Sequence, residues 1–227
     1  MNLQAIMREL KSYSDNKSLE HMARFGMDAS RALGVRIPRL REMGKRLDKN
    51  RELAAQLWAK GMRETMVLAS LVDIPAQVTG EQMDAWVTDL YDWESCDQLI
   101  SNLFARSPLA VKKAMEWSHR DEEYVKRAGY VIMARLAVTE KKAPDTLFDP
   151  FFPLIEEGAS DQRNAVKKAV NWALRQIGKK NAALNKKALA SAKRIAAMDN
   201  SAAKWIASDA IRELESPAVQ NRLKKLA

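Results

Sequence analysis

Apolar residues recur every three or four positions along nearly the whole chain, and Pro, Gly or helix-capping residues interrupt the pattern at short intervals. No stretch alternates between apolar and polar residues over the length of a strand, so a sheet is not expected. The pattern predicts about fourteen helices, near residues 2–13, 18–29, 36–48, 50–60, 62–73, 79–91, 93–106, 108–118, 121–138, 145–157, 160–178, 182–197, 201–214 and 216–226.

Short helices joined by short loops fit either a globular bundle or a solenoid of helical pairs. No crisp sequence repeat is visible, but helix pairs recur every ~35–40 residues, which is the size of HEAT-type units. No linker is long enough to mark a domain boundary. We therefore expect one all-α domain over residues 1–227, a HEAT-like helical-repeat solenoid (an α-α superhelix) with a concave basic groove.

Composition supports a globular helical protein, with 47% hydrophobic and 30% charged residues and only 8 Gly and 7 Pro. The single cysteine cannot form an internal disulfide. The first residues lack the features of a signal peptide, and no run approaches the ~20 apolar residues of a membrane span. We expect a cytoplasmic protein with no membrane contact. Its net charge of 38 − 29 = +9 suits nucleic acid, anionic lipid or an acidic protein partner.

One predicted helical segment, "SDQRNAVKKAVNWALRQIGKKN" at residues 160–181, carries basic residues around an indole. Its packing stripe consists of Val166, Val170, Ala173 and Ile177. The stripe shifted by two residues, about 200° around the helix, carries Lys168, Trp172, Arg175 and Lys179. Cations around an aromatic ring suit a surface that binds phosphates and stacks on a base or sugar. The alternative is that Trp172 packs against a neighbouring helix of the solenoid.

The segment "YDWESCDQLISNLF" places Trp93 and Asp97 side by side, one helical turn apart, at the margin of an apolar face. A carboxylate in that position is costly unless it is paired or faces a wet groove. From this segment alone, a capping or ion-paired aspartate beside a core tryptophan is the favoured interpretation.

Arg127 lies in an increasingly apolar helix within "DEEYVKRAGYVIMARLAV". Its guanidinium is expected to point at a specific partner. An ion pair with Glu123, four residues earlier, is the alternative to a functional contact.

Five segments in the same order carry a resemblance to a known family: "MARFGMDASRALGVRIPRLREMGK", "YDWESCDQL", "EEYVKRAGYV", "VKKAVNWALRQIGKKN" and "KWIASDAIREL". Together, over about residues 20–215, they resemble the bacterial DNA alkylation repair family of AlkD type. Such proteins wrap duplex DNA in the concave face of a HEAT-like solenoid. The characterised glycosylases release cationic N3- and N7-alkylated purines without flipping the base.

The resemblance implies roles for individual residues. Asp97 matches the catalytic aspartate, Trp93 and Trp172 match the two active-site indoles, and Arg127 matches the arginine beside the scissile nucleotide. Phe25 matches a position near the DNA where the characterised enzymes have a tyrosine, so a hydroxyl contact is missing here.

The implied chemistry needs only one carboxylate, because a cationic base leaves as a neutral one without a general acid. Asp97 would stabilise the oxocarbenium-like sugar and orient or deprotonate the attacking water. Indole faces would favour the developing positive charge, and Arg127, Lys168 and Arg175 would hold phosphates. No metal or cofactor is required, and neither His21 nor His119 has ligand-like neighbours.

The leading hypothesis is a monofunctional glycosylase acting on alkylated double-stranded DNA, cytoplasmic and nucleoid-associated, with no obligate protein partner. The second is a non-catalytic HEAT-like module that binds nucleic acid through the same basic surface. A protein-binding scaffold for an acidic partner is a weaker third, because Asp97 and the aromatic residues add nothing to simple charge matching.

Overall fold

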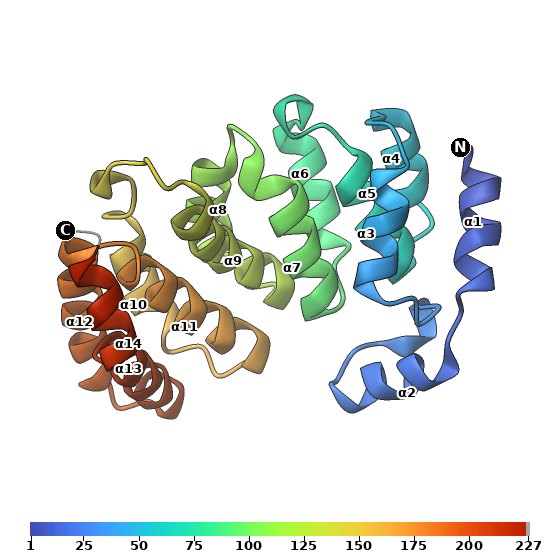
Figure 1. The fold of residues 1–227 in the computed structure, drawn as a ribbon. Helices are drawn as coiled ribbons and strands as arrows, with labels where there is room; N and C mark the ends of the chain where they lie inside the picture. The colour runs from blue at the N-terminus through green and yellow to red at the C-terminus, as the bar shows by residue number, and fades with distance from the viewer. Residues whose placement is uncertain (226–227) are drawn as a thin grey trace. The chain divides into compact units, whose positions relative to one another are not determined.

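The computed structural model describes residues 1–225 of the chain. Over these residues the protein is all-helical, and Figure 1 shows the helices in chain order. The α-helices are α1 (Leu3–Ser12), α2 (Asn16–Arg24), α3 (Ile37–Lys45), α4 (Arg51–Trp58), α5 (Arg63–Val72), α6 (Gly80–Thr88), α7 (Trp93–Asn102), α8 (Ala110–Ser118), α9 (Glu123–Thr139), α10 (Phe151–Gly158), α11 (Asn164–Gly178), α12 (Ala182–Ala196), α13 (Ser201–Leu214) and α14 (Pro217–Lys224). The short 3₁₀ helices are η1 (Ala29–Arg31), η2 (Pro75–Gln77), η3 (Phe104–Arg106) and η4 (Asp145–Leu147).

Every predicted helix has a counterpart in the structure, most of the differences lie at the helix ends, and one predicted helix is divided in two. The α2 helix stops at Arg24 rather than near residue 29, because Gly26 adopts a left-handed φ of 73° just beyond it. The predicted helix at 145–157 is divided into η4 and α10, since Pro150 disfavours helical geometry in the residue before it. The predicted helix at 93–106 ends at Asn102 and continues as η3. Residue 226, which closes the last predicted helix, lies outside the described residues.

The chain forms two compact units, an N-terminal unit of residues 1–109 and a C-terminal unit that begins at Ala110. In the N-terminal unit α5 is the central helix, and every residue of it except Leu71 is buried. Trp58 of α4 and Trp86 of α6 stack on each other with ring centroids 4.2 Å apart. In the C-terminal unit the core forms around α9 and α11, with Trp117 and Tyr130 fully buried. The organisation into a single domain over the whole chain stays a prediction.

Hydrogen bonds between helices reveal the repeat. In the N-terminal unit, partners on successive helix pairs lie 31 residues apart, as in Trp58 with Asp89 and Arg63 with Glu94. In the C-terminal unit the separation is 38 residues, as in Lys187 with Asp149 and Arg194 with Glu156. Within each compact unit, the helices joined by these bonds therefore stack at a regular spacing, as in HEAT-type repeats.

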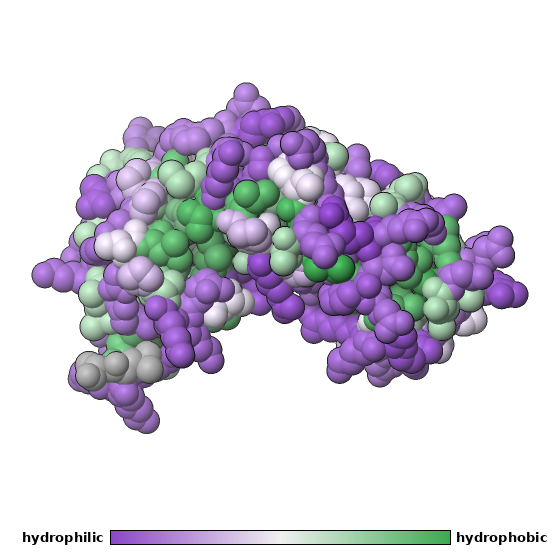
Figure 2. Space-filling model, turned by 90° about the horizontal axis from the view of Figure 1, so that it is seen from above, coloured by the Kyte–Doolittle hydropathy of each residue, from purple (hydrophilic) through white to green (hydrophobic). Residues whose placement is uncertain are grey.

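Side-chain caps define most helix starts. The residues whose side chains accept a hydrogen bond from the first turn of an α-helix are Asn2, Asp15, Asn50, Thr79, Asp92, Asn181, Asn200 and Ser216. Hydrophilic residues cover most of the face in Figure 2, with hydrophobic patches between them. Within the described residues, no helix is both long enough and apolar enough to cross a membrane.

Candidate nucleic-acid interface

Trp93 and Asp97 lie on α7 with the geometry that their spacing predicts. The buried Asp92 caps this helix and accepts hydrogen bonds from Ser95 N at 2.8 Å and Ser95 Oγ at 2.7 Å. Trp93 is thus the first residue of α7, with 36% of its surface exposed, and Asp97 is half-buried one turn later. The interpretation of Trp93 as a core tryptophan is wrong, because the buried face of this helix belongs to Cys96, Leu99 and Ile100.

A buried arginine anchors this end of α7. Arg63 on α5 is 3% exposed and donates from Nε to Glu94 Oε2 at 2.7 Å. Its Nη1 donates to Val35 O at 2.9 Å and to Glu64 Oε1 at 3.0 Å. Glu64 in turn accepts from the backbone N–H groups of Leu33 and Val35. The network fixes both the loop before α3 and the turn that carries Trp93.

Sequence reasoning missed this network. The signal was present in "MRETMVLAS", where an adjacent cation and carboxylate open a helix that is otherwise apolar. Charged residues in a fully buried helix are rare unless they are paired.

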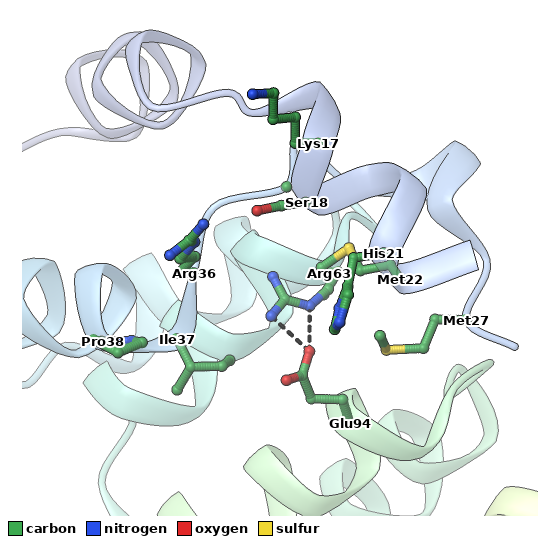
Figure 3. Close-up of a pocket in the computed structure, with 11 residues that line it drawn as sticks. Lys17, Ser18, His21, Met22, Met27, Arg36, Ile37, Pro38, Arg63 and Glu94 are labelled. Atoms are coloured by element: carbon green, nitrogen blue, oxygen red, sulfur yellow. Dashed lines mark hydrogen bonds and ion pairs between the residues drawn. The ribbon is translucent and has the colours of Figure 1, made fainter. Parts of the chain in front are cut away.

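A cavity of about 570 Å³ lies beside the network in the N-terminal unit. Figure 3 shows Arg63 and Glu94 meeting at its centre, with residues of α2 on one side and the start of α3 on the other. Phe25 follows α2 directly and is 60% exposed, with its ring centroid 4.7 Å from that of His21, a residue of the cavity wall.

Arg127 lies on α9 in the C-terminal unit and is only 5% exposed. Its Nη1 donates to the backbone oxygen of Ala165, in the first turn of α11, at 2.6 Å. The guanidinium therefore has a specific partner, as expected, and one such partner is the backbone of the neighbouring helix α11. A contact between Arg127 and DNA stays a prediction.

The α11 stripe divides into paired and exposed residues. Arg175 and Lys179 both form ion pairs with Glu213 on α13, the latter at 2.6 Å, whereas Lys168 is exposed. Burial alone would raise the pKa of Glu213, but hydrogen bonds from Lys179 and Arg175 outweigh it and hold this pKa below its ordinary value. Lys168 is therefore the cation of the stripe with most freedom to meet a phosphate.

Trp172 is half-buried on the face of α11 that carries Lys168, two positions after Val170 of the packing stripe. The amide of Gln176, with its oxygen turned toward them, accepts from Trp172 Nε1 at 3.0 Å and from Lys179 Nζ at 3.2 Å. The indole is thus held by its nitrogen, which fixes the orientation of its ring.

The indole of Trp205 lies at the surface of the C-terminal unit. It is 42% exposed on α13, and Lys167 Nζ lies 5.1 Å from its ring centroid. Asp209 and Arg212, one and two turns later, already indicate the polar face of this helix. Lys167 and Trp205 form a second basic-aromatic pair in the C-terminal unit.

The predicted site residues thus form two sets. Phe25, Trp93 and Asp97 belong to the N-terminal unit, and Arg127, Trp172 and the α11 cations belong to the C-terminal unit. The convergence of the two sets on one surface stays a prediction. Within residues 1–225, no three His, Cys, Asp or Glu side chains come together as a metal site would require.

Comparisons with known proteins connect this geometry to a family. A solved structure described as "a new family of proteins related to the HEAT-like repeat DNA glycosylases with affinity for branched DNA structures" matches with a TM-score of 0.77 and 20% identity, over 98% of this chain and 96% of that one. This likeness establishes the HEAT-like fold. A designed armadillo repeat protein in complex with the peptide (KR)4 matches with a TM-score of only 0.37 and 15% identity, over 96% of this chain and 87% of that one.

No curated protein matches the sequence. The sequence model of one family, described as DNA alkylation repair enzyme, matches residues 6–214. That match spans the core of both units and all eight predicted site residues, and the chain belongs to the DNA alkylation repair enzyme family.

Proposed function

We propose that the protein is a monofunctional DNA glycosylase that hydrolyses the N-glycosidic bond of positively charged N3- and N7-alkylated purines in duplex DNA, without base flipping. The observation that carries the proposal is the pair on α7, an exposed indole one turn before a half-buried carboxylate. Membership of the DNA alkylation repair family supports the choice of substrate. Such an enzyme would act in the cytoplasm on nucleoid DNA.

The chemistry follows from the charge of the substrate. An alkylated purine cation departs as a neutral base, so the bond breaks without a proton donor. The sugar becomes cationic as the bond lengthens, and the Asp97 carboxylate would stabilise that charge and orient the attacking water. The faces of Trp93 and Trp172 would add cation–π stabilisation of about 0.5–2 kcal/mol each.

The test is release of base from a duplex that contains a single N7-methylguanine, measured in a single turnover. Wild type is expected to release the base and Asp97→Asn to bind the duplex without releasing it. Asp48→Asn is the matched control, because Asp48 is an exposed carboxylate on the loop before α4. Release by Asp97→Asn at the wild-type rate would overturn the mechanism.

A second candidate function is non-catalytic binding of DNA. It is favoured by the solved structure at TM-score 0.77, whose proteins are described as having affinity for branched DNA structures. Tight binding to a four-way junction, together with no base release from several alkylated duplexes, would select this function over the first. In both cases binding should weaken steeply with salt, because phosphate contacts release counterions.

A further inference from the structure

A cavity lies beside Arg63 in the N-terminal unit, and the proposed chemistry does not use it. Its volume of about 570 Å³ is within the range of small-ligand clefts. It opens between α2, the start of α3, and the first turns of α5 and α7.

The walls are largely apolar. Met22 and Met27 lie on the α2 side, and Ile37 and Pro38 lie at the start of α3 (Figure 3). Such walls suit a flat ring with apolar faces, and thioether side chains adapt to aromatic rings of different outline. The imidazole of His21 adds an aromatic surface on the same side as Met27.

One wall presents a hydrogen-bond acceptor. Both nitrogens of Arg63 that contact Glu94 bind the same carboxylate oxygen, Oε2, at 2.7 and 2.6 Å. The other oxygen, Oε1, has no hydrogen-bond partner in the part of the chain that the structure describes, although the side chain is only 20% exposed. A carboxylate oxygen in this state accepts from an amino group, such as the one on the Watson–Crick edge of guanine, cytosine or adenine.

Two cations stand at the opening. Lys17 is exposed, and within residues 1–225 its ammonium has no partner. Arg36 has 79% of its side chain exposed, and Asp15 Oδ2 is at the distant limit of an ion pair, 4.0 Å away. Cations with this freedom are suited to the phosphates on either side of a bound nucleotide.

We propose that this cavity binds one unpaired nucleotide of DNA, with its base between the methionines and the start of α3, its amino group on Glu94 Oε1, and its flanking phosphates on Lys17 and Arg36. Guanine fits best, because its N1–H and N2–H groups both donate along the edge that would face the carboxylate. The inference rests on the proposed binding of DNA, and it adds a specific preference for strands that leave a nucleotide unpaired.

The experiment compares four labelled duplexes of one sequence by fluorescence anisotropy. One is fully paired, and the others carry a single unpaired dG, a single unpaired dT or an abasic residue at the same position. Wild type is expected to bind the unpaired dG about tenfold tighter than the paired duplex, with unpaired dT and the abasic residue close to the paired one.

Three variants locate the effect. Lys17→Ala with Arg36→Ala should remove most of the preference for unpaired dG, as should Met27→Trp, which fills the cavity. Glu94→Gln should reduce the dG preference over dT, with thermal unfolding measured alongside because Glu94 pairs with a buried arginine. The matched control is Lys11→Ala with Arg41→Ala, two exposed cations outside the cavity, which should leave the ratio unchanged.

Failure of the inference is separable from failure of the proposed function. Tight binding to all four duplexes with no preference among them would overturn the inference and leave DNA binding intact. A preference for unpaired dG that survives both in the double variant Lys17→Ala with Arg36→Ala and in Met27→Trp would also overturn the inference. No binding to any duplex at low salt would instead reject the proposed function.

Discussion

Arg63 holds Glu94 through two nitrogens, Nε at 2.7 Å and Nη2 at 2.6 Å from the same carboxylate oxygen. The contact ties α5, the buried centre of the N-terminal unit, to the first turn of α7. The same guanidinium also holds the loop before α3 through Val35 O and Glu64. The position of Trp93 thus depends on a residue that no substrate needs to touch.

Replacing Arg63 should therefore be costly. In Arg63→Met the buried carboxylate of Glu64 and the adjoining Glu94 lose their cation, and breaking a buried ion pair on one side costs about 3–5 kcal/mol. Urea unfolding measures the change. Lys60→Met, at an exposed position before α5, should stay within about 0.5 kcal/mol of wild type. A loss below about 1 kcal/mol for Arg63→Met would show that the two carboxylates find other partners.

Trp93→Ala tests the indole directly. Because the ring is 36% exposed, its removal should leave the thermal midpoint nearly unchanged. The loss of one cation–π contact should slow base release from the saturated complex by about 2- to 30-fold. Trp205→Ala, at a similarly exposed indole on α13, should release base at the wild-type rate. Equal slowing in both variants would contradict a specific role for Trp93.

The salt dependence of binding should distinguish the cations of α11. Lys168→Ala should reduce the slope of log K against log salt by about 1, because an exposed lysine on a phosphate contributes about one released counterion. Arg175→Ala should reduce it less, since that guanidinium is already paired with Glu213. Lys186→Ala removes an exposed lysine of α12 as the control. A larger effect for Arg175 than for Lys168 would mean that DNA displaces Glu213 from its partners.

The lowered pKa of Glu213 gives the protein a specific acid sensitivity. A carboxylate whose pKa is depressed in the folded state stabilises the fold above its ordinary value, 4.5, and loses that contribution as the pH falls through the folded pKa. Glu213→Gln should therefore be less stable than wild type by about 1 kcal/mol at pH 7. The difference should shrink below pH 4.5. Unfolding free energies measured from pH 7 downward check this, and a gap that is constant across the range would contradict it.

Helices could be predicted from this sequence because each is determined within its own span. The three- and four-residue spacing of apolar positions and the capping residues are local, so α11 and α13 were located to within a few residues. The position of Trp93 at the start of α7 follows equally from Asp92 as its cap.

Partners on different helices could not be predicted. Arg63 and Glu94 are 31 residues apart, and Arg175 and Glu213 are 38 residues apart, so no local pattern connects them. The three cations of the stripe on α11 therefore appeared equivalent, whereas Glu213 on another helix forms ion pairs with two of them.

The pairing of Arg63 with both Glu64 and Glu94 has a consequence for how such sequences diverge. Loss of the arginine would leave two carboxylates without a cation, so the three positions are expected to change together rather than one at a time. Some relatives would keep Trp93 and Asp97 but have other residues at positions 63, 64 and 94. They would hold the first turn of α7 through other contacts, and the cavity beside it would have a different shape. Covariation at positions 63, 64 and 94 would then divide the family into groups that a comparison of the tryptophan and aspartate alone would not separate.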